Sequence, residues 1–165
     1  MFVDTLVGAI VERLAETLPD LQVEPFPDAP EDYQLYHPVG AALVLYGGSK
    51  YGAPEGTGAL LQERRAEIDI ALLIRNLRGP AGANNHLDAI RLALAGWWPE
   101  GLGRSAALRP TADRFVSHDN GVWRFEISFT CAYPVVEADD EAAAPLLRRL
   151  TLADPAGPDL EVSHG

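Results

Sequence analysis

Residues of types used in catalysis and ligand binding occur in the sequence, but their spacing does not match the chemistry. The glycine-rich segment 52–58 lies between two predicted strands, whereas a phosphate-binding loop joins a strand to a helix and ends in Lys followed by Ser or Thr. The histidines are scattered along the chain: His37, His86, His118 and His164. No two of them have the i, i+4 spacing of a helical metal site. We therefore expect no nucleotide-binding loop and no metal centre.

The candidate nucleophiles and carboxylates have structural explanations. Cys131 is the single cysteine and occupies an inward row between Phe129 and Tyr133, which predicts a small buried side chain rather than a reactive thiolate. No serine lies in a Gly-x-Ser-x-Gly frame. Glu67 and Asp69 share the outward side of a predicted strand, which favours a solvated or interface surface. We expect no catalytic residue and no cofactor, and keep as an alternative a small enzyme whose site is assembled only in space.

Composition and charge exclude several classes of protein. The 165 residues contain 13 Lys and Arg against 24 Asp and Glu, which gives a net charge of -11. Phosphate binding requires paired cations, so a free-standing nucleic-acid-binding protein and a protein that lies on anionic lipid are both disfavoured. The apolar runs are too short to cross a bilayer, and the N-terminus lacks a basic leader. We expect a protein made in the cytoplasm, without a membrane partner.

Hydrophobic periodicity predicts one α+β domain over residues 1–136, with the order α-β-β-β-α-β-β. The helices are expected over 3–18 and from a cap at Asn84 or Asn85 to a stop at Gly96. Strands are expected over 21–27, 39–46, 61–75, 109–118 and 123–133, the last two joined by a hairpin turn at 119–121. We expect a mainly antiparallel sheet of about five strands with both helices on one face; the pairing order is left open.

Three segments outside the regular elements favour contacts with partners. A long glycine-rich loop is expected over 47–58, and the polar half-strand 62–65 is expected to project beyond the sheet. Residues 137–165 form an acidic arm rich in Ala and Pro, with a net charge of -5, expected to be partly flexible. The predicted interface residues are Lys50, Tyr51, Gly52, Pro54, Glu63, Arg64, Trp97, Trp98, Arg148 and Arg149. Aromatic residues in connectors are common at interfaces, although they could also fold back over the sheet.

A series of short motifs resembles the small tail-terminator family of Mu-like long-tailed phages and their defective prophages. The motifs run through residues 2–152 and comprise Phe26-Pro27-Asp28, Glu31-Asp32-Tyr33, His37-Pro38-Val39-Gly40-Ala41, Tyr46-Gly47-Gly48-Ser49, Gly52-Ala53-Pro54, Gln62-Glu63-Arg64, Leu77-Arg78-Gly79, Gly121-Val122-Trp123 and the segment 145–152. Their order and spacing carry the resemblance, rather than any one motif.

The resemblance implies a structural virion protein with an α/β fold and no catalytic residues. Such proteins form a ring, usually a hexamer, at the head-proximal end of the tail tube, where they stop polymerisation and offer a surface to the head. The implied partners are further copies of the chain, the tail tube protein, the head connector protein and, in a contractile tail, the sheath protein. DNA would only pass through the pore, and an acidic ring would repel its phosphates. Another head–tail connector or adaptor ring is the alternative.

Overall fold

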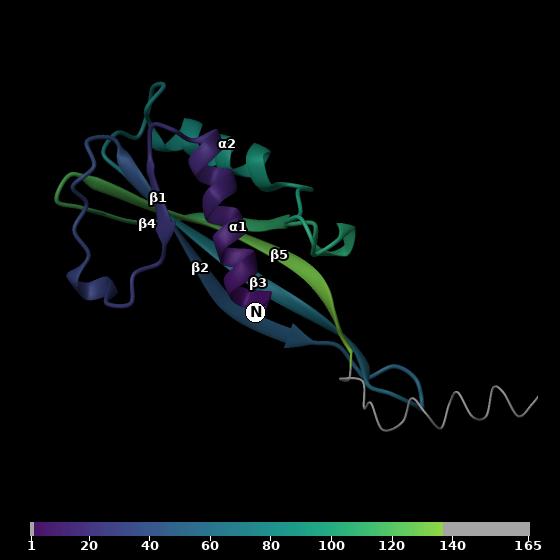
Figure 1. Ribbon diagram of the computed structural model, residues 1–165. Helices are drawn as coiled ribbons and strands as arrows, with labels where there is room; N and C mark the ends of the chain where they lie inside the picture. The colour runs from purple at the N-terminus through teal and green to yellow at the C-terminus, as the bar shows by residue number, and fades with distance from the viewer. Residues whose placement is uncertain (1, 137–165) are drawn as a thin grey trace, which may run out of the picture.

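A five-stranded sheet covered by two helices makes up residues 2–136, the part of the chain that the computed structural model describes (Figure 1). In chain order the elements are α1 (Phe2–Thr17), β1 (Gln22–Pro25), β2 (Gly40–Tyr51), β3 (Leu61–Ile74), α2 (Ala83–Leu94), β4 (Arg109–Asp119) and β5 (Val122–Val136). The predicted order of elements is confirmed. The predicted arm over 137–165 and its boundary with the domain lie outside the described residues.

The strands are arranged in the order β1-β2-β3-β5-β4. β1 pairs with β2 in parallel, and the other three neighbouring pairs are antiparallel, so the prediction of a mainly antiparallel sheet is confirmed. β1 is a short edge strand that ends at Pro25. A proline lacks the N–H group that a ladder uses, which explains the end of the strand at an edge position.

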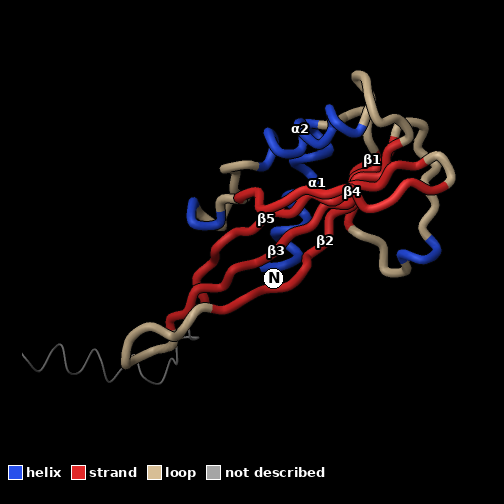
Figure 2. Tube along the Cα trace, turned by 180° about the vertical axis from the view of Figure 1, so that it is seen from behind, coloured by secondary structure: helices blue, strands red, loops and turns tan. Residues whose placement is uncertain are grey.

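Both helices lie on one side of the sheet, as predicted (Figures 1 and 2). α1 buries Leu6, Ile10 and Leu14, which lie three and four residues apart and therefore on one face of the helix. They belong to one core with the alternating inward residues of β3 and β5, among them Ile68 and Phe129. Neither helix in the described part of the chain is long and apolar enough to cross a membrane.

A two-residue turn joins β4 to β5. Asn120 and Gly121 have φ angles of 50° and 74°, and Asp119 pairs with Val122. Positive φ at both central residues is the geometry of a type I′ turn, whose twist suits a hairpin and whose preferred sequence is Asn-Gly. The hairpin predicted from this dipeptide is confirmed.

The start of α2 differs from the prediction. Its N-cap is Gly82, not Asn84 or Asn85, and the Asn85 side chain instead donates to the Pro80 carbonyl at 2.9 Å. A Cβ atom at Gly82 would lie 2.5 Å from the backbone of Arg78, so a tight turn before the helix requires glycine at this position. The predicted stop is confirmed, because Gly96 follows the helix with a φ of 77°.

The loop predicted over 47–58 is also corrected. β2 continues to Tyr51, and the loop spans 52–60. Alternation in β2 is interrupted at Gly47, where the register with β3 shifts between Tyr46 and Gly48. Such an extra residue is a β-bulge, which breaks the two-residue pattern by which a strand is recognised in a sequence.

Candidate functional site

Three strands extend together beyond the helices, as Figures 1 and 2 show. We call this part the projecting ribbon and define it as residues 48–51 of β2, 61–66 of β3 and 131–136 of β5, which are paired side by side. The prediction that 62–65 would project beyond the sheet is therefore corrected, because all four residues pair with β5, and Arg64 and Arg65 also pair with β2. At the tip, the Gly52 N–H donates to the Glu63 carbonyl at 2.8 Å, and the Gln62 side chain donates to the Gly52 carbonyl at 2.6 Å.

Most of the predicted interface residues lie on the projecting ribbon or its loop. Lys50 and Tyr51 lie on its β2 strand, Glu63 and Arg64 on its β3 strand, and Gly52 and Pro54 in the exposed loop that joins the two strands. Lys50 is 83% exposed and forms an ion pair with Glu67 at 3.3 Å. The ribbon thus gathers residues that the sequence places in two separate segments.

The bulge at Gly47 brings Tyr46 and Ser49 to the same face of β2. Tyr46 pairs with Ile68 and Ser49 with Ala66, and both of those β3 residues face the helices. In a regular strand, positions three apart point to opposite faces, but the unpaired Gly47 lets Tyr46 and Ser49 share one face. The Tyr46 and Ser49 hydroxyls lie 2.6 Å apart as a result.

Arg64 lies at the centre of a polar and aromatic cluster at the base of the ribbon. Its guanidinium donates to the Ser49 hydroxyl at 2.9 Å and to the Tyr46 hydroxyl at 2.8 Å. Its central carbon lies 4.7 Å from the ring centre of Phe2, 5.7 Å from that of Tyr46 and 5.9 Å from that of Tyr51. These distances are those of cation–π contacts. We call these five residues the Arg64 cluster.

The Arg64 cluster changes the acidity of one member and extends to β5. Burial acts to raise the pKa of Tyr46, but hydrogen bonds with Ser49 and Arg64 and the positive charge of Arg64 outweigh it and hold that pKa below its ordinary value. The Phe2 ring stacks on Tyr133 with centroids 4.4 Å apart. The cluster therefore connects the start of α1 to all strands of the ribbon.

The two tryptophans lie apart from the ribbon and differ from each other. Trp97 is half-buried against the main core, and its backbone carbonyl accepts from the Leu108 N–H at 2.8 Å, so this residue folds back over the sheet. Trp98 is 40% exposed. Both line a shallow groove of about 540 Å³ beside α1, together with Arg13 and the three carboxylates of Glu12, Glu16 and Glu100. Arg148 and Arg149 lie outside the described residues.

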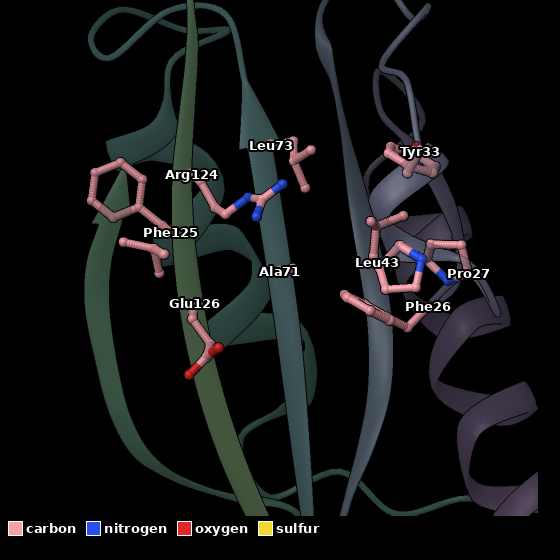
Figure 3. A pocket seen from close by; sticks show the side chains of 11 residues that line it. Phe26, Pro27, Tyr33, Leu43, Ala71, Leu73, Arg124, Phe125 and Glu126 are labelled. Carbon is pink, nitrogen blue, oxygen red and sulfur yellow. The ribbon is translucent and has the colours of Figure 1, made fainter. Parts of the chain in front are cut away.

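A small cavity that sequence reasoning missed lies on the sheet face opposite the helices. The loop over 26–38 covers Leu43 and Leu73 there and leaves a cavity of about 150 Å³ (Figure 3). Arg75 holds the loop in place, because its guanidinium donates to the carbonyls of Leu35 at 2.8 Å and His37 at 3.1 Å. The contact joins residues about forty positions apart, which no local pattern reveals.

The hydroxyl of Tyr33 in this loop should ionise at a higher pH than that of an ordinary tyrosine. Its burial, its hydrogen bond to Glu24 and the negative charge of Glu24 raise its pKa from 10.0 to about 12. A raised folded-state pKa means that its contribution to stability is present below pH 10, the unfolded value, and is lost as pH rises toward 12. Ultraviolet absorbance titration of the protein and of Tyr33→Phe should differ by one tyrosine that ionises near pH 12. A difference centred on the ordinary value would contradict this placement.

The remaining candidate residues have local partners. His86 is buried, with ring nitrogens 2.8 Å from the Gly82 carbonyl and 2.8 Å from the Asp20 carboxylate. Cys131 is 1% exposed, and burial raises the pKa of its thiol. The Asp69 carboxylate accepts from the Ser128 hydroxyl at 2.5 Å. Within residues 2–136, no three His, Cys, Asp or Glu side chains gather in a way that could hold a metal ion.

Comparison with known proteins connects the chain to one family. No curated protein matches the sequence. A chain in the solved structure of the virion of a native gene transfer agent (GTA) particle has a similar fold, with a TM-score of 0.53 and 15% sequence identity over 81% of this chain and 97% of that chain. The model of the Gp37 protein family matches residues 10–154, most of the sequence. The chain therefore belongs to the Gp37 protein family.

Proposed function

We propose that this protein is a structural component of a phage or phage-like particle, and that it acts as the tail terminator. In this role a ring of identical copies closes the head-proximal end of the tail tube, stops its polymerisation and presents the surface to which the head binds. The fold shared with nearly the whole of a chain from a gene transfer agent virion supports the general role. The ordered motifs that resemble tail terminators support the specific one.

The observation that carries the proposal is the projecting ribbon. A ring is built from two different patches on each subunit, which meet head to tail and close by rotation. The ribbon offers two such patches at the two outer strands, β2 and β5. Large apolar side chains are exposed on it, with Tyr51 at 55%, Leu61 at 42% and Val136 at 62%. Apolar side chains gathered in this way mark surfaces that bind partners.

A non-enzymatic role follows from the same proposal. In the described part of the chain, the groups that could do chemistry are separate and already engaged: His86 with Asp20, Asp69 with Ser128, and the Cys131 thiol in the core. The proposed partners are neighbouring copies, the tail tube protein and the head connector protein, with the sheath protein in a contractile tail. DNA passes through the pore without being bound.

Tail length tests the function directly. Particles assembled without this protein should have tail tubes longer than normal and no attached heads, because nothing ends polymerisation; electron microscopy measures both. Supplying the intact protein in trans is the control and should restore a single tube length. Tubes of normal length with detached heads would favour the alternative, a connector or adaptor ring. Tubes of normal length with attached heads would contradict both.

A further inference from the structure

The projecting ribbon has two strand edges without a partner strand in residues 2–136. β1 pairs only with residues 41–44 of β2, so the β2 edge is uncovered from Leu45 to Tyr51. β4 pairs only with residues 122–130 of β5, so within residues 2–136 no strand pairs with the β5 edge from Cys131 to Val136. The 3₁₀ helix Arg104–Ala106 packs against β5, where Ser105 lines a pocket with Ala132, Tyr133 and Pro134. Among the described residues, no backbone hydrogen bond joins this helix to the edge. Free edges of this length expose backbone N–H and C=O groups that pair readily with another strand.

The direction of these backbone groups follows from one hydrogen bond. The Glu63 carbonyl accepts from the Gly52 N–H, so Glu63 directs its backbone groups toward β2. Along a strand, the backbone N–H and C=O groups of successive residues point alternately to the left and right neighbour. In a non-hydrogen-bonded antiparallel pair, the backbone groups of the two residues point away from each other. Ser49 and Tyr51 therefore direct their groups away from β3. Pro134, which is level with Glu63, directs its own away from β3 on the other side of the ribbon.

We propose that the β2 edge of one copy pairs in parallel with the β5 edge of the next copy, so that the projecting ribbons form one continuous sheet around the ring. This inference rests on the proposed function. β2 and β5 are both antiparallel to β3 and hence run in the same direction. In a ring of more than two copies, the rotation from one copy to the next does not reverse the direction of a strand. The β2 edge of one copy and the β5 edge of the next therefore run in the same direction, and their contact is parallel. A twofold dimer would instead pair like edges in antiparallel fashion.

The end of β4 selects the register of this contact. In a parallel ladder an edge residue donates to one residue of the neighbour and accepts from the residue two positions further along. Placing Tyr51 level with Val135 lets the Tyr51 N–H donate to the Pro134 carbonyl and the Val136 N–H donate to the Tyr51 carbonyl. In the same register the Ser49 N–H donates to the Ala132 carbonyl, but the Ser49 carbonyl receives no donor, because Pro134 lacks an N–H. If Tyr51 were instead level with Tyr133, the Ser49 N–H would have to donate to the Thr130 carbonyl. Thr130 already pairs with Arg109 of β4, so this register is blocked.

The side chains are compatible with this register. Tyr51, Tyr133 and Val135 all point to the face that carries Arg64, because the first two pair with Arg64 and the third lies two residues after Tyr133. The half-exposed ring of Tyr51 would then pack beside Tyr133 and Val135 of the next copy, an arrangement that stabilises sheets. On the other face, the long side chain of Lys50 would lie level with Pro134, next to the small side chain of Ala132.

Disulfide cross-linking of the full-length chain tests the contact. In the variant Lys50→Cys with Pro134→Cys, the two Cα atoms are about 5 Å apart between copies, within the range for a disulfide. Within one copy they are two strand spacings and two residues apart, because Lys50 is level with Ala132, which amounts to roughly 12 Å. Oxidation of rings formed in solution or on purified tail tubes should give a ladder of covalent multimers up to the ring size. Each single variant should stay uncross-linked, as should the parent protein, whose Cys131 is 1% exposed.

The outcomes separate the inference from the proposed function. Rings detected by light scattering or on tubes, but without the ladder, would overturn the edge contact and leave the terminator role standing. Dimers from Lys50→Cys alone would show antiparallel pairing of β2 edges and overturn the contact. Absence of any ring, in solution and on tubes, would overturn both. Tyr51→Pro removes an outward N–H without breaking the β3 ladder, and should weaken assembly about fivefold relative to Tyr51→Thr.

Discussion

Replacing Arg64 with alanine is expected to lower the free energy of unfolding by about 2 kcal/mol. The guanidinium makes two hydrogen bonds, to Ser49 and Tyr46, and lies over three aromatic rings. Its removal leaves the half-buried hydroxyls of Tyr46 and Ser49 without a charged partner. It also removes the guanidinium that lies over the Phe2 ring. Urea-induced unfolding followed by tryptophan fluorescence measures the change, which corresponds to roughly 6 °C in Tm for a chain of this size.

The neighbouring residue supplies a matched control. Arg65 has the same side chain, is exposed on the opposite face of β3 and, among residues 2–136, forms its ion pair with the exposed carboxylate of Glu63. Surface ion pairs contribute little, so Arg65→Ala should change the free energy of unfolding by less than about 0.5 kcal/mol. An equal decrease in the free energy of unfolding for the two variants would show that the contacts of Arg64 stabilise the fold no more than the surface ion pair of Arg65 does.

The same variant separates stability from assembly. If the Arg64 cluster holds the ribbon in position against α1, Arg64→Ala should also reduce the cross-linking between the cysteines introduced at positions 50 and 134. Tyr46→Phe is a milder comparison, because it removes one hydroxyl and keeps the ring beneath the guanidinium. Its effects on stability and on cross-linking should both lie between those of the parent protein and Arg64→Ala.

The strands and helices with regular patterns were predictable from the sequence. β5 alternates from Trp123 to Tyr133, and its inward residues line the core as expected. The Asn120-Gly121 dipeptide predicts the hairpin because both residues tolerate positive φ. In these segments local preference and final environment agree, so the pattern alone is sufficient.

The segments that differ from the prediction depend on contacts distant in the sequence. Gly82 begins α2 because the backbone of Arg78 leaves no space for a Cβ atom, which a preference for Asn at helix caps does not capture. The loop over 26–38 covers the second face of the sheet because Arg75 holds it at Leu35 and His37. These arrangements exist only after the chain has folded, so a single sequence carries no signal for them.

The candidate site was predicted in part for the same reason. Lys50, Tyr51, Glu63 and Arg64 were predicted as interface residues, and the structure places all four on the projecting ribbon. Phe2 and Tyr46 were missed as partners of Arg64. Phe2 comes from the far end of the sequence. Tyr46 lies three residues before Ser49, a spacing that in a regular strand would place the two side chains on opposite faces.

Deleting Gly47 and Gly48 together should be at least as damaging as removing Arg64. Gly47 is the unpaired residue of the bulge and Gly48 pairs with Glu67, so their loss makes Ser49 directly follow Tyr46, and Ser49 and the residues after it would point to the other face. Ser49 and Tyr51 would leave the Arg64 cluster, and Lys50 would point into it beside the guanidinium. The loss of the cluster together with the repulsion of two cations is expected to cost about 3 kcal/mol of unfolding free energy.

A deletion in the adjoining loop controls for the shortening of the chain. Thr57 and Gly58 lie in the exposed loop 52–60, so deleting both should cost less than about 1 kcal/mol because loop length has a weak effect on closure entropy. The two deletions should also differ in the cross-linking assay. Loss of Gly47 and Gly48 reverses the face on which the cysteine at position 50 lies and should abolish the covalent ladder, whereas loss of Thr57 and Gly58 should preserve it. If the ladder survives the deletion of Gly47 and Gly48, the face of Lys50 does not determine the contact with the next copy, and the proposed register is wrong.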